Sequence, residues 1–89
     1  MTDKVVRELP APETGNKITY DDEVAGLGVR VTAAAARAYI FNYRVRATGK
    51  ERRITIGDAT NEAGDTALKI GAARDKAEKL RQRVRDGED

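Results

Sequence analysis

The residues best suited to chemistry lie along one stretch, YIFNYRVRATGKERRITIG, which runs from Tyr39 to Gly57. Successive side chains of a β-strand point to opposite faces, so an aromatic and apolar row that starts at Tyr39 alternates with a row that carries an amide and guanidinium groups. Arginine can bond guanine in bidentate fashion, and asparagine can do the same with adenine. The alternation predicts a strand that buries one face and offers the other to a nucleic acid.

Two neighbouring segments, LGVRVT before the strand that starts at Tyr39 and RRITIG after it, alternate in the same sense. Three such strands in succession are typical of an antiparallel meander with one buried face. The ATGK loop places a glycine where a hairpin needs a positive φ angle. We expect the DNA-binding side chains to be those of the outward face and its hairpin: Arg30, Thr32, Asn42, Arg44, Arg46, Lys50, Arg53 and Thr55.

The inward row is predicted to contain Leu27, Val29, Val31, Tyr39, Phe41, Tyr43, Val45, Ile54 and Ile56. A protein that binds single strands would need exposed aromatic rings as stacking platforms, whereas these rings point inward. The pattern therefore favours duplex DNA. One apolar residue, Ile40, falls in the polar row, where it either packs on a loop or touches a thymine methyl group.

A cover for the inward row is available near the C-terminus. In KIGAARDKAEKLRQRVRDG the apolar residues recur at spacings of three and four, as in an amphipathic helix that packs on a core. Gly87 suits the C-terminal cap of this helix. The predicted stripe consists of Ile70, Ala73, Ala77, Leu80 and Val84.

The length of 89 residues allows one domain. We expect an N-terminal arm with a short strand over residues 1–26, a three-stranded antiparallel sheet over 27–57, a loop over 58–68 and a helix over 69–87. The predicted fold class is therefore α+β, with the three strands and the short N-terminal strand packed on one C-terminal helix.

The N-terminal arm carries two further features. Thr2 is expected to cap a helical turn that runs to Leu9, with Val5 and Leu9 on one side. The run from Asp21 to Glu23 could ligate a hard cation, but consecutive residues at a strand end do not converge on one point. A solvated turn is the favoured interpretation of this run.

Composition excludes several classes of function. The chain has no cysteine for a disulfide or thiolate site, and no histidine, the commonest metal ligand and general base. No apolar run approaches the roughly 18 residues of a membrane span, and the N-terminus lacks the order of a signal peptide. We expect a cytoplasmic protein with no cofactor, no metal and no membrane partner.

The net charge of +2 conceals an uneven distribution. Residues 27–57 hold seven Lys or Arg against one Asp or Glu, whereas residues 1–26 hold three against six and residues 58–89 hold seven against eight. A basic block of this kind is the footprint expected of a polyanion-binding surface. A solvated sheet face, whose arginines discourage aggregation, is the alternative.

Several segments also match a known pattern: a Thr-Asp-Lys opening, a Tyr-Asp-Asp segment that leads to GLGVRV, an aromatic strand that ends in Tyr-Arg, and GKERR with a closing Thr-Ile-Gly. The matching residues are Thr2, Asp3, Lys4, Asp21, Asp22, Gly26, Leu27, Gly28, Arg30, Val31, Phe41, Tyr43, Arg44, Gly49, Lys50, Arg53, Thr55 and Gly57. Together with the helix AARDKAEKLRQRVRDGED, they make the chain resemble the N-terminal domain of phage-type integrases, which are tyrosine recombinases.

This resemblance implies a module that binds double-stranded DNA at the arm-type sites of a phage or genomic-island integrase. It also implies other integrase subunits as partners. The catalytic part of such an enzyme lies further C-terminal, so we expect this fragment not to be an enzyme and assign no nucleophile among Tyr20, Tyr39 and Tyr43. The family's Tyr-Pro turn before the helix is replaced here by DATNEAGDTALK, which leaves the helix start open.

Two other functions remain open at this stage. The first is a protein-interaction module of the recombination complex, which would use the helix face with Lys76, Lys79 and Arg83. The second is a stand-alone transcription factor that reads DNA with a similar sheet. Salt dependence separates DNA binding from an apolar protein contact, because phosphate neutralisation makes affinity fall steeply with salt.

Overall fold

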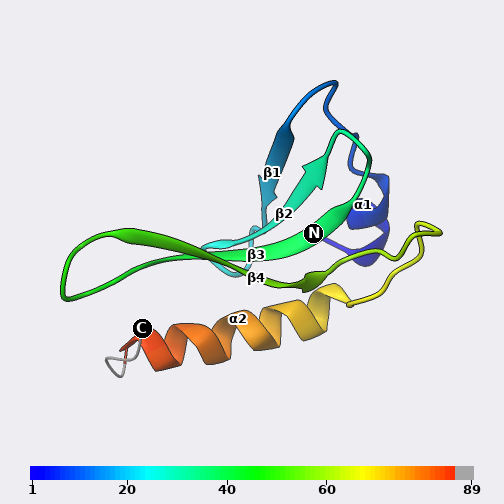
Figure 1. Cartoon of the computed structure of the whole chain (residues 1–89). Coiled ribbons are helices and arrows are strands. Elements are labelled where there is room, and N and C mark those ends of the chain that lie inside the picture. The colour runs from blue at the N-terminus through cyan, green and yellow to red at the C-terminus, as the bar shows by residue number, and fades with distance from the viewer. Residues whose placement is uncertain (86–89) are drawn as a thin grey trace.

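The computed structural model describes residues 1–85 of the chain. Its elements are α1 (Asp3–Glu8), β1 (Asn16–Tyr20), β2 (Leu27–Thr32), β3 (Arg37–Arg44), β4 (Glu51–Asp58) and α2 (Ile70–Arg85). The strands form one antiparallel sheet in the order β1-β2-β3-β4, and α2 runs alongside β3 and β4 (Figure 1). The α+β class with a short N-terminal strand, three main strands and a C-terminal helix is confirmed.

The strand register places the predicted inward row on one face. Val29 pairs with Tyr39 across β2 and β3, and Phe41 pairs with Ile54 across β3 and β4. The buried cluster consists of Val6, Val24, Leu27, Val29, Val31, Tyr39, Phe41, Ala59, Ile70, Ala73 and Ala77. Val45 was expected in this row but lies outside the cluster, because β3 already ends at Arg44.

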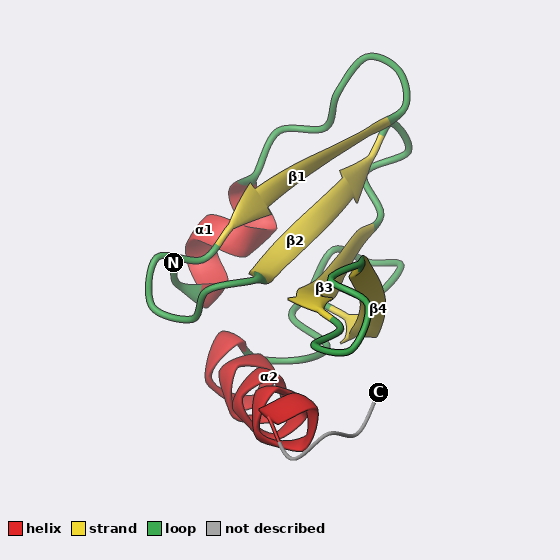
Figure 2. Cartoon of the chain, turned by 90° about the vertical axis from the view of Figure 1, so that its left-hand side faces the viewer, coloured by secondary structure: helices red, strands yellow, loops and turns green. Residues whose placement is uncertain are grey.

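Helix α2 covers this face through the predicted stripe except for its last member, Val84, which is half-buried and lies outside the buried cluster. Ala73 and Ala77 have no exposed surface, Ile70 is buried, and Leu80 packs against the same cluster. The small alanine side chains let the helix axis come close to the aromatic rings of the sheet, and Figure 2 shows α2 lying beneath β3 and β4. The helix begins at Ile70, one residue after the predicted start. The predicted end at residue 87, with Gly87 as its cap, lies outside the described residues.

The sheet is bent by a β-bulge in its last pair of strands. Tyr39 pairs with Gly57 but Ile40 pairs with Thr55, so Ile56 is an extra residue on β4. A bulge increases the local right-handed twist. In Figure 1, β1 and β2 accordingly rise steeply from the line of β3 and β4.

The N-terminal arm folds as a short helix whose buried side differs from the expected one. Thr2 caps α1 as predicted, because its side chain accepts a hydrogen bond from the Val5 N–H at 3.2 Å. Leu9 packs against the buried cluster, but Val5 of the same expected side is 45% exposed and Val6 is buried instead. A helix of six residues, fewer than two turns, carries too little periodicity to define a face. The orientation of α1 is set by contacts with distant elements, such as the 2.6 Å hydrogen bond from the Ile70 N–H to the Asp3 carboxylate at the start of α2.

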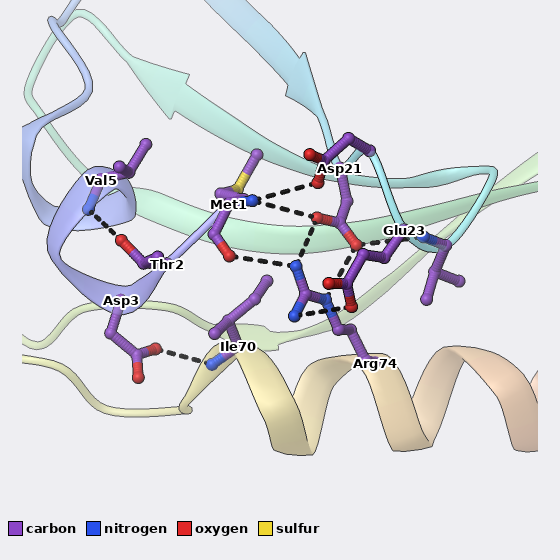
Figure 3. Close-up of polar contacts among 10 residues, drawn as sticks. Met1, Thr2, Asp3, Val5, Asp21, Glu23, Ile70 and Arg74 are labelled. Carbon is purple, nitrogen blue, oxygen red and sulfur yellow. Dashed lines mark hydrogen bonds and ion pairs between the residues drawn. The ribbon is translucent and has the colours of Figure 1, made fainter.

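The interpretation of the acidic run as a solvated turn is wrong for Asp21, whose side chain has no exposed surface. Arg74 of α2 donates from Nε to Asp21 Oδ2 at 3.0 Å and from Nη2 to Asp21 Oδ1 at 2.9 Å. The same guanidinium lies 3.0 Å from Glu23 and donates to the Met1 carbonyl, as Figure 3 shows. The Arg74 hydrogen bonds lower the pKa of Asp21 to about 2. The run therefore joins α2 to the β1–β2 loop, and no cluster of acidic side chains in residues 1–85 is arranged to hold a metal ion.

Candidate nucleic-acid interface

The face of the sheet turned away from α2 carries most of the predicted binding residues. Strand register puts Asn42 opposite Arg53, and Ile40 opposite Thr55. We define the hairpin cluster as Asn42, Arg44, Lys50, Arg53 and Thr55, all of which lie on β3, β4 or the turn between them. Figure 1 shows that this hairpin extends as a long arm away from β1 and β2.

A chain of hydrogen bonds crosses this face from β4 to β1. Arg53 Nε donates to Asn42 Oδ1 at 2.9 Å, and Asn42 Nδ2 donates to the Tyr20 hydroxyl at 2.5 Å. Tyr20 is 50% exposed. Tyr20 is not among the binding residues predicted from the sequence. Tyr20 lies at the end of β1, two positions after Ile18 and therefore on the same face of the strand. This alternation is the feature of the sequence that could have indicated its place on the sheet face.

Gly28 allows Tyr20 to reach Asn42 across the intervening strand β2. Tyr20 pairs with Gly28, and a Cβ atom added at Gly28 would lie only 3.1 Å from the Tyr20 ring and 3.1 Å from the Thr19 carbonyl. On the other side Gly28 pairs with Ile40, which has no exposed surface. Ile40 is thus buried within the sheet face, and of the two roles left open for it, contact with a thymine methyl group is wrong.

Arg30 and Thr32 lie on the outward face toward the end of the sheet opposite Arg44. Arg30 pairs with Ala38 of β3, six positions before Arg44, a separation of about 20 Å along a strand. Thr32 accepts a hydrogen bond from the Ala36 N–H at 3.2 Å, so its hydroxyl helps to close the β2–β3 turn. The structure therefore divides the predicted site into the hairpin cluster and a second position at the other end of the sheet.

Arg46 does not belong to the outward face. Strand β3 ends at Arg44, so the alternation stops before Arg46 and the backbone enters the hairpin turn, which the Val45 N–H closes on the Lys50 carbonyl at 2.8 Å. Arg46 Nη1 donates to the Arg85 carbonyl at 3.0 Å. A cation is favoured there because the last carbonyls of a helix carry partial negative charge.

The remaining arginine of the cluster is held only loosely. Arg44 Nη2 lies 3.4 Å from Glu51 Oε1, and the two side chains are 69% and 77% exposed. Exposed ion pairs of this kind contribute about 0–1 kcal/mol. An incoming phosphate group can therefore replace Glu51 as the partner of Arg44 at little cost.

The tyrosines of β3 lie on the helix side. Tyr39 has no exposed surface, and burial raises the pKa of its phenol to about 12, so it stays protonated at neutral pH. The ring of Tyr43 stacks on Phe41 with centroids 6.1 Å apart. Both positions agree with the predicted inward row and leave these rings to the core.

The fold and this surface define a small α+β domain with one sheet face covered by a helix and a cationic face open. Residues 1–89 match the family model described as an Arm DNA-binding domain. The chain belongs to this family, the N-terminal arm-type domains of phage integrases, which confirms the resemblance found in the sequence. No curated protein is matched by its sequence. Within the described part of the chain, neither helix is long and apolar enough to cross a membrane.

Proposed function

We propose that this domain is the module through which a phage or genomic-island integrase, a site-specific tyrosine recombinase, binds arm-type sites in duplex DNA. The outward face of the β3–β4 hairpin is the proposed contact. The observation that carries the proposal is the pairing of Asn42 with Arg53 on an exposed sheet face whose reverse side is the buried aromatic core. Membership of the Arm DNA-binding family supports DNA as the partner.

The shape of the hairpin suits a major groove. A two-stranded ribbon fits a major groove about 12 Å wide. With the hairpin inserted, Arg44 and Arg53 reach base edges or the nearest phosphates, and Lys50 at the turn meets the backbone. Arg30 lies about 20 Å from Arg44 along the sheet, and its proposed contact is a flanking phosphate.

Duplex DNA is favoured over a single strand because the aromatic rings of β3 are not available for stacking. Tyr39 and Phe41 are buried, and Tyr43 is partly buried against Phe41. Tyr20 is the exposed ring, and it lies along the sheet over Gly28. The polar groups around it are better suited to phosphate oxygens than to a stacked base.

The fragment itself has no proposed catalytic role. Cleavage and joining of DNA would be carried out by the rest of the parent recombinase, in the cytoplasm of a bacterial host cell and together with other integrase subunits. One small module binds weakly alone, and linkage to further DNA-binding domains raises the effective affinity.

An amide chemical-shift titration of the 89-residue chain with a short duplex, repeated at two salt concentrations, tests the proposal. We expect shifts at Asn42, Arg44 and Arg53 that weaken steeply as salt rises, because phosphate contacts release counterions. Shifts confined to α2, or no shifts at low salt, would reject the outward face as the DNA contact.

A second candidate function is favoured by a groove between β4 and α2. Its volume is about 320 Å³, and its floor includes Ile54, Ile56 and Leu80. Lys76 and Lys79 also line it, so it would suit an acidic amphipathic segment of another subunit. Partner binding at this groove would persist at high salt if apolar contacts dominate, in contrast to binding at the hairpin.

A further inference from the structure

The hydrogen bonds on the outward face have a fixed direction. An arginine Nε only donates, so the atom of Asn42 that faces Arg53 at 2.9 Å must be Oδ1. The amide nitrogen of Asn42 therefore faces Tyr20 at 2.5 Å, and because it only donates, the Tyr20 oxygen accepts. The single hydroxyl hydrogen of Tyr20 is left to donate in a direction away from Asn42.

This direction leaves a group of donors without acceptors on one patch. The Tyr20 hydroxyl hydrogen has no acceptor among residues 1–85, and Tyr20 is 50% exposed. The Nη1 and Nη2 groups of Arg53, which is exposed, likewise have no partner in the described part of the chain. The Tyr20 hydroxyl and the Arg53 guanidinium lie on either side of the Asn42 amide. Donors of these two kinds form hydrogen bonds with phosphate oxygens.

We propose that Tyr20 is a DNA phosphate contact and that Asn42 is a positioning residue, which aims Tyr20 and Arg53 instead of reading a base. This inference rests on the function proposed above. One hydrogen of Asn42 Nδ2 is donated to Tyr20 and one lone pair of Oδ1 accepts from Arg53, so the orientation of the amide is fixed by the protein on both sides. Asn42 therefore acts on DNA through its two neighbours.

The direction of the bond between Tyr20 and residue 42 can be reversed by one substitution. In Asn42→Asp the carboxylate still accepts from Arg53 Nε, but it must also accept from Tyr20, because a carboxylate has no hydrogen to donate. The Tyr20 hydroxyl then donates into the protein and no longer to phosphate. Removal of that hydroxyl should be costly in the native background and nearly neutral in the Asn42→Asp background.

A double-mutant cycle tests this relation with a fluorescently labelled short duplex of mixed sequence, titrated at low salt. We expect Tyr20→Phe to weaken binding about tenfold, as for the loss of a hydrogen bond to a charged group, with an unchanged salt slope because tyrosine is neutral. In the Asn42→Asp background the same change should alter affinity less than about twofold. Equal losses in both backgrounds would overturn the role given to Asn42.

Matched controls separate this inference from the proposed function. Tyr39→Phe removes the same hydroxyl from the buried face and should leave affinity unchanged. If Arg44→Ala weakens binding but Tyr20→Phe does not, the phosphate contact is overturned and the proposed function stands. If neither change alters binding, both are overturned.

A spectroscopic signature distinguishes positioning from a purely structural role. In Asn42→Ala the Arg53 Nε–H loses its acceptor, so its proton resonance should exchange faster with water in the free protein while the thermal midpoint stays near that of the native chain. An Arg53 Nε–H signal identical in the native chain and in Asn42→Ala would show that Asn42 does not hold this side chain in solution, and would overturn the positioning role.

Discussion

Asp21 and Arg74, which lie 53 residues apart in the chain, form a bidentate ion pair between the β1–β2 loop and the first turns of α2. The Asp21 side chain has no exposed surface, and the Arg74 side chain is 20% exposed. Because planar guanidinium and carboxylate groups match in geometry, this pair fixes the position of α2 along the sheet. The apolar stripe of the helix could otherwise slide over the aromatic face.

Replacement of Asp21 should therefore destabilise the domain. Asp21→Ala leaves Arg74 without its buried partner, and we expect a loss of about 3 kcal/mol in the free energy of unfolding, measured with urea. Asp22→Ala is the matched control, since the Asp22 side chain is 80% exposed, and it should cost less than about 1 kcal/mol. An Asp21→Ala chain as stable as the native one would contradict the anchoring role.

The same carboxylate predicts a loss of stability in acid. Its pKa is about 2 in the folded state against 3.8 for the ordinary side chain, so its contribution is complete above pH 3.8 and is lost as the pH falls through 2. Linkage gives about 2 kcal/mol for a shift of this size. The free energy of unfolding should fall more steeply over this window in the native chain than in Asp21→Asn, and parallel pH profiles would count against the ion pair.

The two faces of β3 should respond in opposite ways to truncation. Phe41 is 1% exposed, so Phe41→Ala should cost roughly 3–5 kcal/mol through lost burial and the cavity left behind. The thermal midpoint of this variant is to be compared with that of Arg44→Ala, which should stay close to the native value. A stable Phe41→Ala chain would mean that the faces are reversed.

Arg44→Ala should weaken DNA binding without unfolding the domain. Loss of one phosphate contact lowers the salt slope of the binding constant by about 0.9, and loss of a base contact costs on the order of 1–3 kcal/mol at a specific site. Lys79→Ala removes the same charge from α2 and should change the slope little. The prediction fails if the two variants lose affinity equally.

Glu51→Gln should strengthen DNA binding. It removes the carboxylate that lies 3.4 Å from Arg44 and a negative charge beside the expected DNA backbone, for a gain of about 0.2–1 kcal/mol at low salt. Glu62→Gln makes the same charge change in the exposed loop before α2 and serves as the control. Equal gains from both variants would indicate an effect of net charge alone.

The faces of the sheet were predictable from the sequence. A period of two assigns each side chain of an extended strand to one face or the other, which placed Tyr39 and Phe41 in the core and Asn42 and Arg53 outside. Apolar residues at spacings of three and four in the C-terminal segment likewise identified the helix and most of its buried stripe.

Other relations were decided only by the tertiary structure. Alternation does not say where a strand ends, and β3 stops at Arg44, which turns Arg46 toward α2. It also does not say which residues of different strands meet, because that depends on register and twist. The contact of Tyr20 with Asn42 spans 22 residues and passes over a glycine, Gly28, on the strand between them.

The sequence by itself thus determined the three main strands and the C-terminal helix, the side of each that faces the core, and the cationic character of the outward face, since these follow from local periodicity and charge. The tertiary structure alone decided that Asp21 is a buried anchor for Arg74 and that Asn42 is engaged by Tyr20 and Arg53. Short polar contacts between distant segments depend on the position of each segment to within about an ångström, and local periodicity does not contain that information.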